Sequence, residues 1–204
     1  PPGMPDAEEG ADFREVGGSY IGENFEQNVA EAKKLMEDAG FPNGEGFPEL
    51  TLMYNDGAGH KAIAEAVQDM WKNNLGINIK LDSQEWAVFQ ETRNQGNYEI
   101  ARHGWIGDYL DPMTMLDMWI SSSGQNDSRW KNSEYDELID LAKKSGDQKE
   151  RMEAMHKAEE IIMTEMPIIP VYYYTDTYLI NPDIEGFVYD PLGFKVFLYA
   201  TRKQ

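Results

Sequence analysis

The stretch Ile77-Asn78-Ile79-Lys80-Leu81 alternates apolar and polar side chains without interruption. Because successive side chains of a strand point to opposite faces, this pattern predicts a strand with one buried face. Residues 50–55 and 98–103 predict two more strands, and apolar residues at helical spacing predict helices over 58–75 and 84–95. The order strand, helix, strand, helix, strand indicates an α/β lobe whose sheet is at least partly parallel.

The segments on either side of this centre carry their own local signals. Residues 1–23 are rich in Pro, Gly and acids and predict an extended segment, and a helix is expected over 25–39 with Val29, Leu35, Met36 and Ala39 on its apolar face. Ser83 is expected to cap the helix over 84–95. After residue 112 we expect, in order, a short helix from Pro112, a helix from Asn132 or Ser133 to about 144, a helix from Asp147 to about 165, and strands at 168–174, 178–180 and 196–199.

Composition limits the possible functions. Eighteen Lys and Arg against 37 Asp and Glu give a net charge of −19, which repels nucleic-acid phosphates and anionic membrane surfaces. The chain has no Cys, so thiol chemistry and disulfides are excluded. No apolar run approaches the length of a membrane span. Because the chain opens at Pro1-Pro2-Gly3 without Met, we expect a fragment of a longer exported protein.

The stretch 102–112, Arg-His-Gly-Trp-Ile-Gly-Asp-Tyr-Leu-Asp-Pro, holds the chemistry of greatest interest. It places aromatic residues and two carboxylates between a predicted strand and a predicted helix. An acid held there, beside rings that exclude water, can bind a cationic group. Asp111 directly precedes Pro112, so we interpret it as a helix cap. For Asp108 the residues alone leave two interpretations open, a turn or capping residue and a ligand-binding acid.

Short pieces spread over nearly the whole chain resemble the oligopeptide-binding proteins, the extracytoplasmic family 5 receptors of ABC peptide importers. In order, these pieces are Glu31-Ala32-Lys33-Lys34-Leu35, Tyr54-Asn55, Trp71-Lys72-Asn73-Asn74-Leu75-Gly76-Ile77, Gln84-Glu85-Trp86, Thr92-Arg93-Asn94-Gln95-Gly96, Ala101-Arg102, Gly104-Trp105, Asp108-Tyr109 and Ile169-Pro170-Val171-Tyr172-Tyr173-Tyr174. No single piece is specific, but together and in this order they identify the family.

The resemblance implies a fold, an organisation and partners. The fold is one α/β lobe of a periplasmic-binding-protein-like type II receptor, with a mixed sheet flanked by helices. Residues 1–175 would form a peptide-binding lobe that is incomplete at its N-terminus, and residues 176–204 would return to the other lobe of the full protein. The implied protein is a monomer without cofactor or metal. It binds peptides outside the cytoplasm, lipid-anchored if its source is Gram-positive, and delivers them to a membrane permease and ATPase.

The same resemblance assigns candidate binding residues. Asp108 matches the acid that pairs with the α-ammonium of the peptide, whereas Arg93, Arg102 and His60 are candidates for its carboxylate. Arg offers a planar fork for a carboxylate, but Arg93 could instead be a helix C-terminal cation, and His60 could be a surface residue.

Aromatic residues and methionines have competing interpretations. Trp86, Trp105 and Tyr109 could wall side-chain pockets, whereas Trp71 and Trp119 are better interpreted as core. Most methionines, such as Met70, Met152 and Met155, have core spacing; Met113, Met115 and Met118 stay open as an adaptable surface.

Other function classes find less support. A hydrolase would need a second acid beside Asp108, such as Asp111 or Glu85, but no nucleophile motif accompanies them. His60, His103 and His156 have no metal-ligand spacing, and Asn55-Asp56-Gly57 is too short for a calcium loop. Within the family, a dipeptide, a nickel chelate, a signalling peptide or a sugar remains an alternative ligand.

Overall fold

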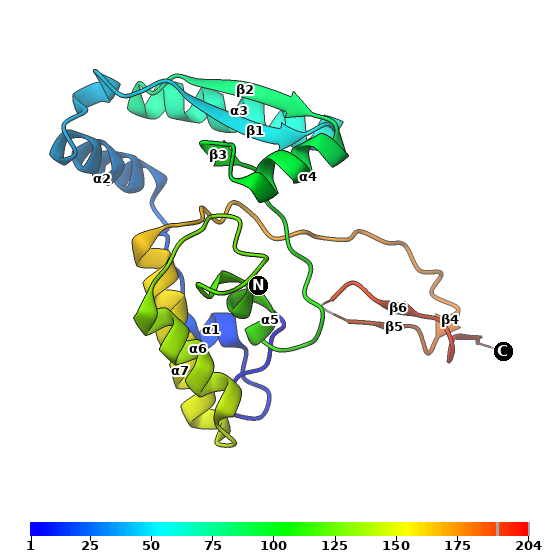
Figure 1. The fold of residues 1–204 in the computed structure, drawn as a ribbon. Helices are drawn as coiled ribbons and strands as arrows, with labels where there is room; N and C mark the ends of the chain where they lie inside the picture. Colours follow the sequence, from blue (N-terminus) through cyan, green and yellow to red (C-terminus); the bar gives the residue numbers. More distant parts are fainter. Residues whose placement is uncertain (191, 204) are drawn as a thin grey trace. The chain divides into compact units, whose positions relative to one another are not determined.

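The computed structural model describes residues 1–190 and 192–203. The chain forms two compact units (Figure 1). One unit is the continuous segment Ser19–Gly104, and the other combines Pro1–Gly18 with Trp105–Gln204. The chain therefore passes from one unit to the other after Gly18 and after Gly104.

The unit Ser19–Gly104 is built on a parallel three-stranded sheet. Its strands β1 (Leu50–Asn55), β2 (Ile79–Gln84) and β3 (Ile100–Ala101) lie in the order β2-β1-β3. β1 pairs with β2 over its full length, from Leu50 opposite Ile79 to Asn55 opposite Gln84. Figure 1 shows α3 (Ala58–Leu75) running along β1 and β2, and α4 (Trp86–Gln95) connects β2 to β3. The predicted order of strands and helices and the α/β class are thus confirmed.

Local chemistry explains where these elements begin and end. Gly76 and Gly96 take left-handed backbone conformations with φ of 72° and 73° and close α3 and α4, at a position where a side chain would be strained. The predicted cap Ser83 was wrong. Glu85 caps α4, because its carboxylate accepts hydrogen bonds from the N–H groups of Ala87 and Val88. The third strand is shorter than predicted, because only Ile100 and Ala101 pair with β1.

Helix α2 (Phe25–Asp38) precedes the sheet and is followed by the short 3-10 helix η1 (Pro42–Gly44). None of the residues of α2, all of which the structure describes, is buried, and Leu35 is 61 % exposed. Met70 in α3 is 55 % exposed. The core position predicted for Met70 was therefore wrong, and the apolar face predicted to include Leu35 is not buried. Helical spacing selects a face, but it does not supply the neighbour that covers it.

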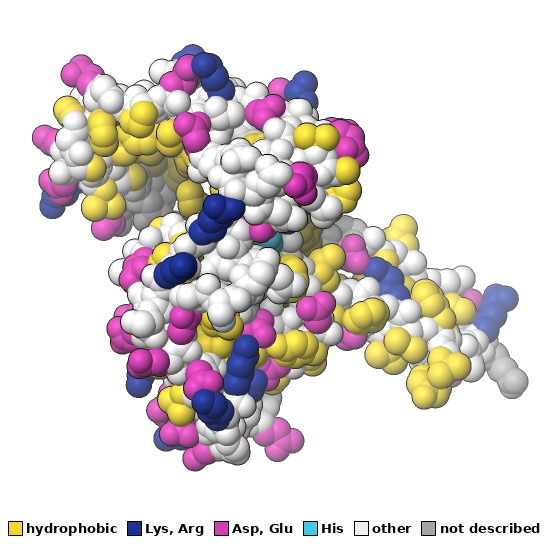
Figure 2. All heavy atoms as spheres, viewed as in Figure 1, with side chains coloured by type: hydrophobic (Ala, Val, Ile, Leu, Met, Phe, Trp, Pro, Cys, Tyr) yellow, Lys and Arg dark blue, Asp and Glu magenta, His cyan; other side chains and the backbone are white. Residues whose placement is uncertain are grey.

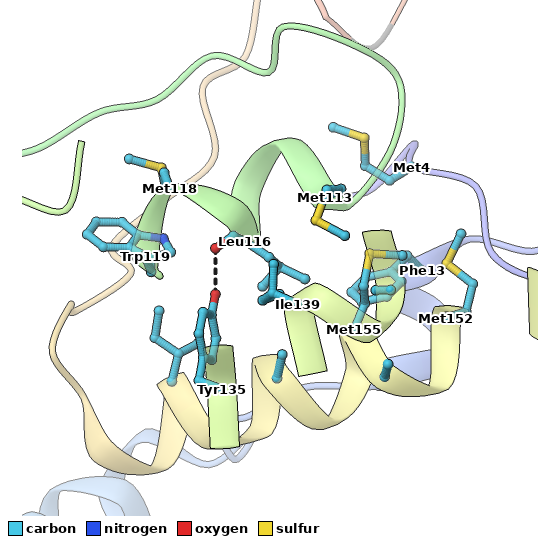
Figure 3. Packing of buried hydrophobic residues seen from close by; sticks show 14 residues of the cluster. Met4, Phe13, Met113, Leu116, Met118, Trp119, Tyr135, Ile139, Met152 and Met155 are labelled. Atoms are coloured by element: carbon cyan, nitrogen blue, oxygen red, sulfur yellow. Dashed lines mark hydrogen bonds between the residues drawn. The ribbon is translucent and has the colours of Figure 1, made fainter. Parts of the chain in front are cut away.

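The other unit packs helices around one apolar core (Figure 3). Its elements are α1 (Phe13–Gly17), α5 (Met113–Leu116), η2 (Asp117–Trp119), α6 (Ser133–Lys144) and α7 (Gln148–Glu165). Asn132 caps α6 by accepting from the Tyr135 N–H, and Asp147 caps α7 by accepting from Lys149 and Glu150. These two helix starts were predicted by the side-chain acceptors that precede them.

The core of this unit is rich in methionine. Met152 and Met155 from α7 are at most 1 % exposed, as predicted, and Trp119 is buried. Met113 and Met118 are also buried, and Met115 packs against the same cluster. These methionines fill a core, and the adaptable-surface interpretation that had stayed open for them is wrong.

The C-terminal segment contains less regular structure than expected. Residues 168–174 and 178–180, all of which the structure describes, form no strand, and only β6 (Lys195–Val196) falls near the predicted 196–199 strand. β6 pairs antiparallel with β5 (Val188–Tyr189), and β4 (Ile184–Glu185) pairs antiparallel with β7 (Thr201–Arg202). A β-prone run becomes a strand only when another strand accepts and donates its hydrogen bonds, which residues 168–174 do not find.

Candidate functional site

The loop 105–112 holds Asp108 exposed on a backbone that is tied to α5. The side chain of Asp108 is exposed, while Gly107 and Pro112 beside it are buried. The N–H of Asp108 donates a hydrogen bond of 3.0 Å to Oγ1 of Thr114, which is itself 2 % exposed. The carboxylate is therefore presented to solvent from a fixed main chain.

Asp111 has the capping role that was predicted for it and a second role that was not. Its Oδ1 accepts from the Met113 N–H at 2.9 Å, so it holds the start of α5. The helix begins at Met113, so the prediction of Pro112 as its first residue was wrong by one position. Both carboxylate oxygens also accept from Arg151 of α7, at 2.7 Å each. This bidentate geometry joins the loop to a helix 40 residues further along the chain.

The pKa of Tyr109 reports the electrostatics around the loop. Burial raises the pKa of the Tyr109 hydroxyl, and the carboxylates of Asp117, Asp111 and Asp108 raise it further, while Arg151 lowers it. Both carboxylates of the loop act in the same direction on this ring. Tyr109 is 44 % exposed, so its ring lies beside these carboxylates where solvent can reach it.

Trp105 lies at the beginning of the loop. It is partly buried and packs against the methionine-rich core. Its indole nitrogen is buried and has no hydrogen-bond partner among the described residues. Because most buried indole N–H groups have an acceptor, Trp105 is unusual among the described residues.

The remaining candidate residues belong to the unit Ser19–Gly104, and two of them meet on Phe89. Trp86 and Phe89 stack with ring centroids 6.0 Å apart, and the guanidinium carbon of Arg93 lies 5.4 Å from the centroid of the same ring. Trp86 is 46 % exposed and Phe89 fully buried. The exposed Trp86 indole and the Arg93 guanidinium therefore both pack on the buried Phe89 ring.

Arg102 and His60 lie close to the carboxyl end of β1. The Arg102 N–H donates to the Met53 carbonyl at 2.8 Å, and its Nη1 donates to Oδ1 of the buried Asn55 at 3.2 Å. His60 is partly buried near the start of α3, and its Nδ1 has no hydrogen-bond partner among the described residues. Side chains at the carboxyl ends of parallel strands are a common source of ligand contacts.

The structure therefore forms two groups of candidates: Trp105, Asp108 and Tyr109 in one unit, and His60, Trp86, Arg93 and Arg102 in the other. Sequence reasoning missed Thr114 and Asn55, which hold Asp108 and Arg102, and Arg151, which holds Asp111 of the same loop. Thr114 had a weak local signal, a polar residue amid the apolar run of α5, whereas no local pattern points to Arg151.

Among the described residues, no group of three or more His, Cys, Asp or Glu side chains could hold a metal, and no helix is long and apolar enough to cross a bilayer.

Comparison with known sequences identifies the family. Residues 1–127 match the family model of bacterial extracellular solute-binding proteins, family 5, middle region, a solute-binding rather than an enzymatic family. The chain is 39 % identical over 195 residues to the dipeptide-binding protein DppE of Bacillus subtilis, covering 95 % of this chain and 35 % of DppE. It is 40 % identical over 163 residues to the periplasmic murein peptide-binding protein MppA of Escherichia coli, covering 79 % of this chain and 30 % of MppA. The chain spans about a third of the length of these relatives.

Solved structures agree with this assignment. The unliganded open form of MppA superimposes with a TM-score of 0.74 at 39 % identity, covering 84 % of this chain and 34 % of that one. The OppA of Haemophilus influenzae in complex with the peptide RPPGFSPFR gives a TM-score of 0.73 at 33 % identity, covering 83 % of this chain and 33 % of that one. The predicted periplasmic-binding-protein-like α/β lobe is thereby confirmed. The chain belongs to the bacterial extracellular solute-binding proteins of family 5.

Proposed function

We propose that this chain supplies part of the peptide-binding surface of an extracytoplasmic receptor that serves an ABC importer. Asp108 binds the α-ammonium group of the peptide, and Trp105 and Tyr109 flank it. No bond is made or broken in the peptide. The captured peptide passes to a membrane permease, and an ATPase drives its release into the cell.

The observation that carries the proposal is the exposed Asp108 carboxylate on a backbone held by Thr114. A carboxylate that is fixed before the ligand arrives loses little conformational freedom on binding. Since Arg151 neutralises Asp111 through two hydrogen bonds, Asp108 is the acid of this loop that is left to a ligand.

The peptide carboxylate requires a cation, and Arg93, Arg102 and His60 are the proposed partners. Arg102 is held by Asn55 and Arg93 lies over Phe89, so both guanidinium groups are oriented. His60 has a buried ring nitrogen that can take part in a hydrogen bond. Trp86 presents an exposed indole face that suits side chains of many kinds.

The organisation of the full-length protein is also part of the proposal. Residues 1–175 contribute to the peptide-binding lobe, and residues 176–204 return to a second lobe. Apolar side chains gather over the C-terminal segment (Figure 2), and Leu179, Leu198 and Tyr199 are more than two thirds exposed. Such exposure supports a further partner surface, since monomeric proteins seldom leave large apolar patches uncovered. The receptor is a monomer outside the cytoplasm, lipid-anchored in a Gram-positive cell.

Calorimetry on the full-length protein tests the proposal. Di-, tri-, tetra- and pentaalanine are each titrated with a free and with an acetylated N-terminus, on the wild-type protein and on Asp108→Asn. We expect acetylation and the substitution each to weaken binding of the best peptide by at least tenfold, and not additively, because both remove the same ion pair. Equal binding of free and acetylated peptides would contradict the role of Asp108.

The same peptide series separates the proposal from its nearest alternative. One relative at 39 % identity is named a dipeptide-binding protein, which supports a receptor for short ligands. Tightest binding of dialanine would assign the chain to that class. A nickel chelate, a signalling peptide or a sugar would instead leave the whole series unbound. Turnover of a chromogenic peptide or glycoside would overturn the proposal that the protein is not an enzyme.

A further inference from the structure

Thr114 touches the Asp108 loop through both branches of its side chain. Its hydroxyl oxygen accepts the N–H of Asp108 at 3.0 Å. Its methyl carbon lies against Gly107, where an added Cβ would stand only 3.1 Å from it. The Thr114 N–H also donates to the Asp111 carbonyl at 3.2 Å, so one buried residue holds the loop on both sides of Tyr109.

Gly107 makes this close approach possible. A Cβ at this position would also lie 3.0 Å from Cδ2 of Leu192 and 3.5 Å from Cε of Met115. These contacts are tighter than normal packing for at least two of the three atoms. The absence of a side chain at residue 107 therefore lets the loop approach both Thr114 and Leu192 closely.

We propose that Thr114 is the positioning residue of the ammonium-binding acid: its hydroxyl fixes the backbone of Asp108 and thereby sets the selectivity of the site for a free amine. This inference rests on the proposed function of Asp108. Thr114 itself is 2 % exposed, so its side chain is closed to a ligand. It acts through Asp108, so it should affect only the affinity that comes from pairing the peptide ammonium with the Asp108 carboxylate.

The physical reason is preorganisation. An exposed aspartate on an untied loop samples many positions, and binding must then restrict it at a cost in entropy. The strength of an ammonium–carboxylate hydrogen bond also depends on distance and angle. With its N–H held, Asp108 retains freedom mainly about its own side-chain torsions.

Two substitutions at the same residue separate the hydrogen bond from packing. Thr114→Val keeps the volume and removes the acceptor, whereas Thr114→Ser keeps the acceptor and removes the methyl group. Thr164→Val, at an exposed position of α7 in the same unit, is the matched control. Each variant of the full-length protein is titrated with the alanine peptide that the wild type binds best and with its N-acetylated copy.

We expect Thr114→Val to weaken binding of the free peptide roughly three- to tenfold, the equivalent of one hydrogen bond, and to leave the acetylated peptide within about twofold. Thr114→Ser should retain most of the wild-type preference for the free over the acetylated peptide, and Thr164→Val should retain all of it. Equal weakening of both peptides by Thr114→Val would reduce its role to packing and overturn the inference. If Asp108→Asn abolishes the preference while Thr114→Val preserves it, the inference fails and the proposed function stands; if Asp108→Asn leaves the preference intact, the proposed function itself fails.

A measurement on the wild-type protein covers the case in which Thr114→Val does not fold. Hydrogen–deuterium exchange with fragmentation that resolves single amides should show the Asp108 N–H protected without peptide, although its side chain is exposed. The N–H of Ile106, an exposed residue for which no such acceptor is seen among the described residues, serves as the internal reference. Exchange of Asp108 at the rate of Ile106 would overturn the inference.

Discussion

Arg151 donates to both carboxylate oxygens of Asp111 at 2.7 Å, and this pair fastens the loop that carries Asp108 to helix α7. The two side chains are 19 % and 21 % exposed, so solvent screens the pair only in part. The hydrogen bonds that Arg151 donates to Asp111 raise the pKa of its guanidinium above the ordinary value, against the effect of burial. The ion pair therefore also holds the loop against helix α7.

Removing Arg151 should destabilise the chain. Arg151→Met leaves the Asp111 carboxylate partly buried without its partner, and we expect the free energy of unfolding to fall by about 1–3 kcal/mol. Arg151→Lys keeps the charge but loses the bidentate geometry, so its free energy of unfolding should lie between those of the wild type and Arg151→Met. Urea unfolding followed by tryptophan fluorescence measures the effect, with the exposed Lys149→Met as control. Wild-type stability of Arg151→Met would show that the pair contributes nothing.

The hydroxyl group of Tyr135 should contribute to the free energy of unfolding. The ring is fully buried, and the hydroxyl donates to the Leu116 carbonyl at 2.6 Å, as the dashed line in Figure 3 marks. Burial and the nearby carboxylates raise its pKa, so it is a neutral donor at all ordinary pH values. Tyr135→Phe should lower the free energy of unfolding by about 1–2 kcal/mol because the carbonyl is left unsatisfied. Urea unfolding measures this effect. Tyr173→Phe, at an exposed position, should leave the free energy of unfolding unchanged and is the control.

Asn126 should hold the loop between η2 and α6. Its Nδ2 contacts the carbonyls of Trp119, Ile120 and Trp130 at 3.1, 3.3 and 2.8 Å, and the residue is 8 % exposed. Asn126→Ala removes this shared donor, and we expect a loss of about 1–3 kcal/mol together with faster amide exchange across residues 120–130. Gln125→Ala, at the exposed neighbouring position, should change neither quantity. Unchanged exchange in Asn126→Ala would mean that other contacts hold the loop.

Asp12 should make stability depend on pH near the N-terminus. Burial acts to raise the pKa of Asp12, but hydrogen bonds from the N–H groups of Gly3, Arg14 and Glu15 together hold the pKa below its ordinary value of 3.8. A carboxyl whose pKa is lowered on folding stabilises the fold above its unfolded pKa, and this contribution is lost as the pH falls through the folded value. Wild type should therefore exceed Asp12→Asn in thermal stability at pH 5–7, and the difference should shrink below about pH 4.

The reference for that experiment is Asp12→Ala. Asn still accepts hydrogen bonds at a helix N-terminus, whereas Ala does not, so Asp12→Ala should be the less stable of the two variants at every pH. A difference between wild type and Asp12→Asn that stays constant from pH 7 to pH 2.5 would contradict the assigned effect of charge.

Much of the fold was predictable because its signals are local. The alternation at 77–81 and the helical spacing over 58–75 depend on neighbours a few residues away, and β1 and α3 begin and end where expected. The caps Asn132 and Asp147 act within three residues of themselves. In the candidate site, the same reasoning assigned Asp111 to the start of α5. The role of Asp108 as a ligand-binding acid came from the family resemblance and remains a prediction.

The tertiary structure alone decided the long-range relationships. Arg151 meets Asp111, Arg102 meets Asn55, and the burial of Met113 and Met118 depends on helices brought together from distant positions. The β-prone run at 168–174 found no pairing strand. Periodicity and capping arise from the geometry of one segment, whereas an ion pair, a buried face or a sheet partner requires two segments whose distance only the folded backbone sets.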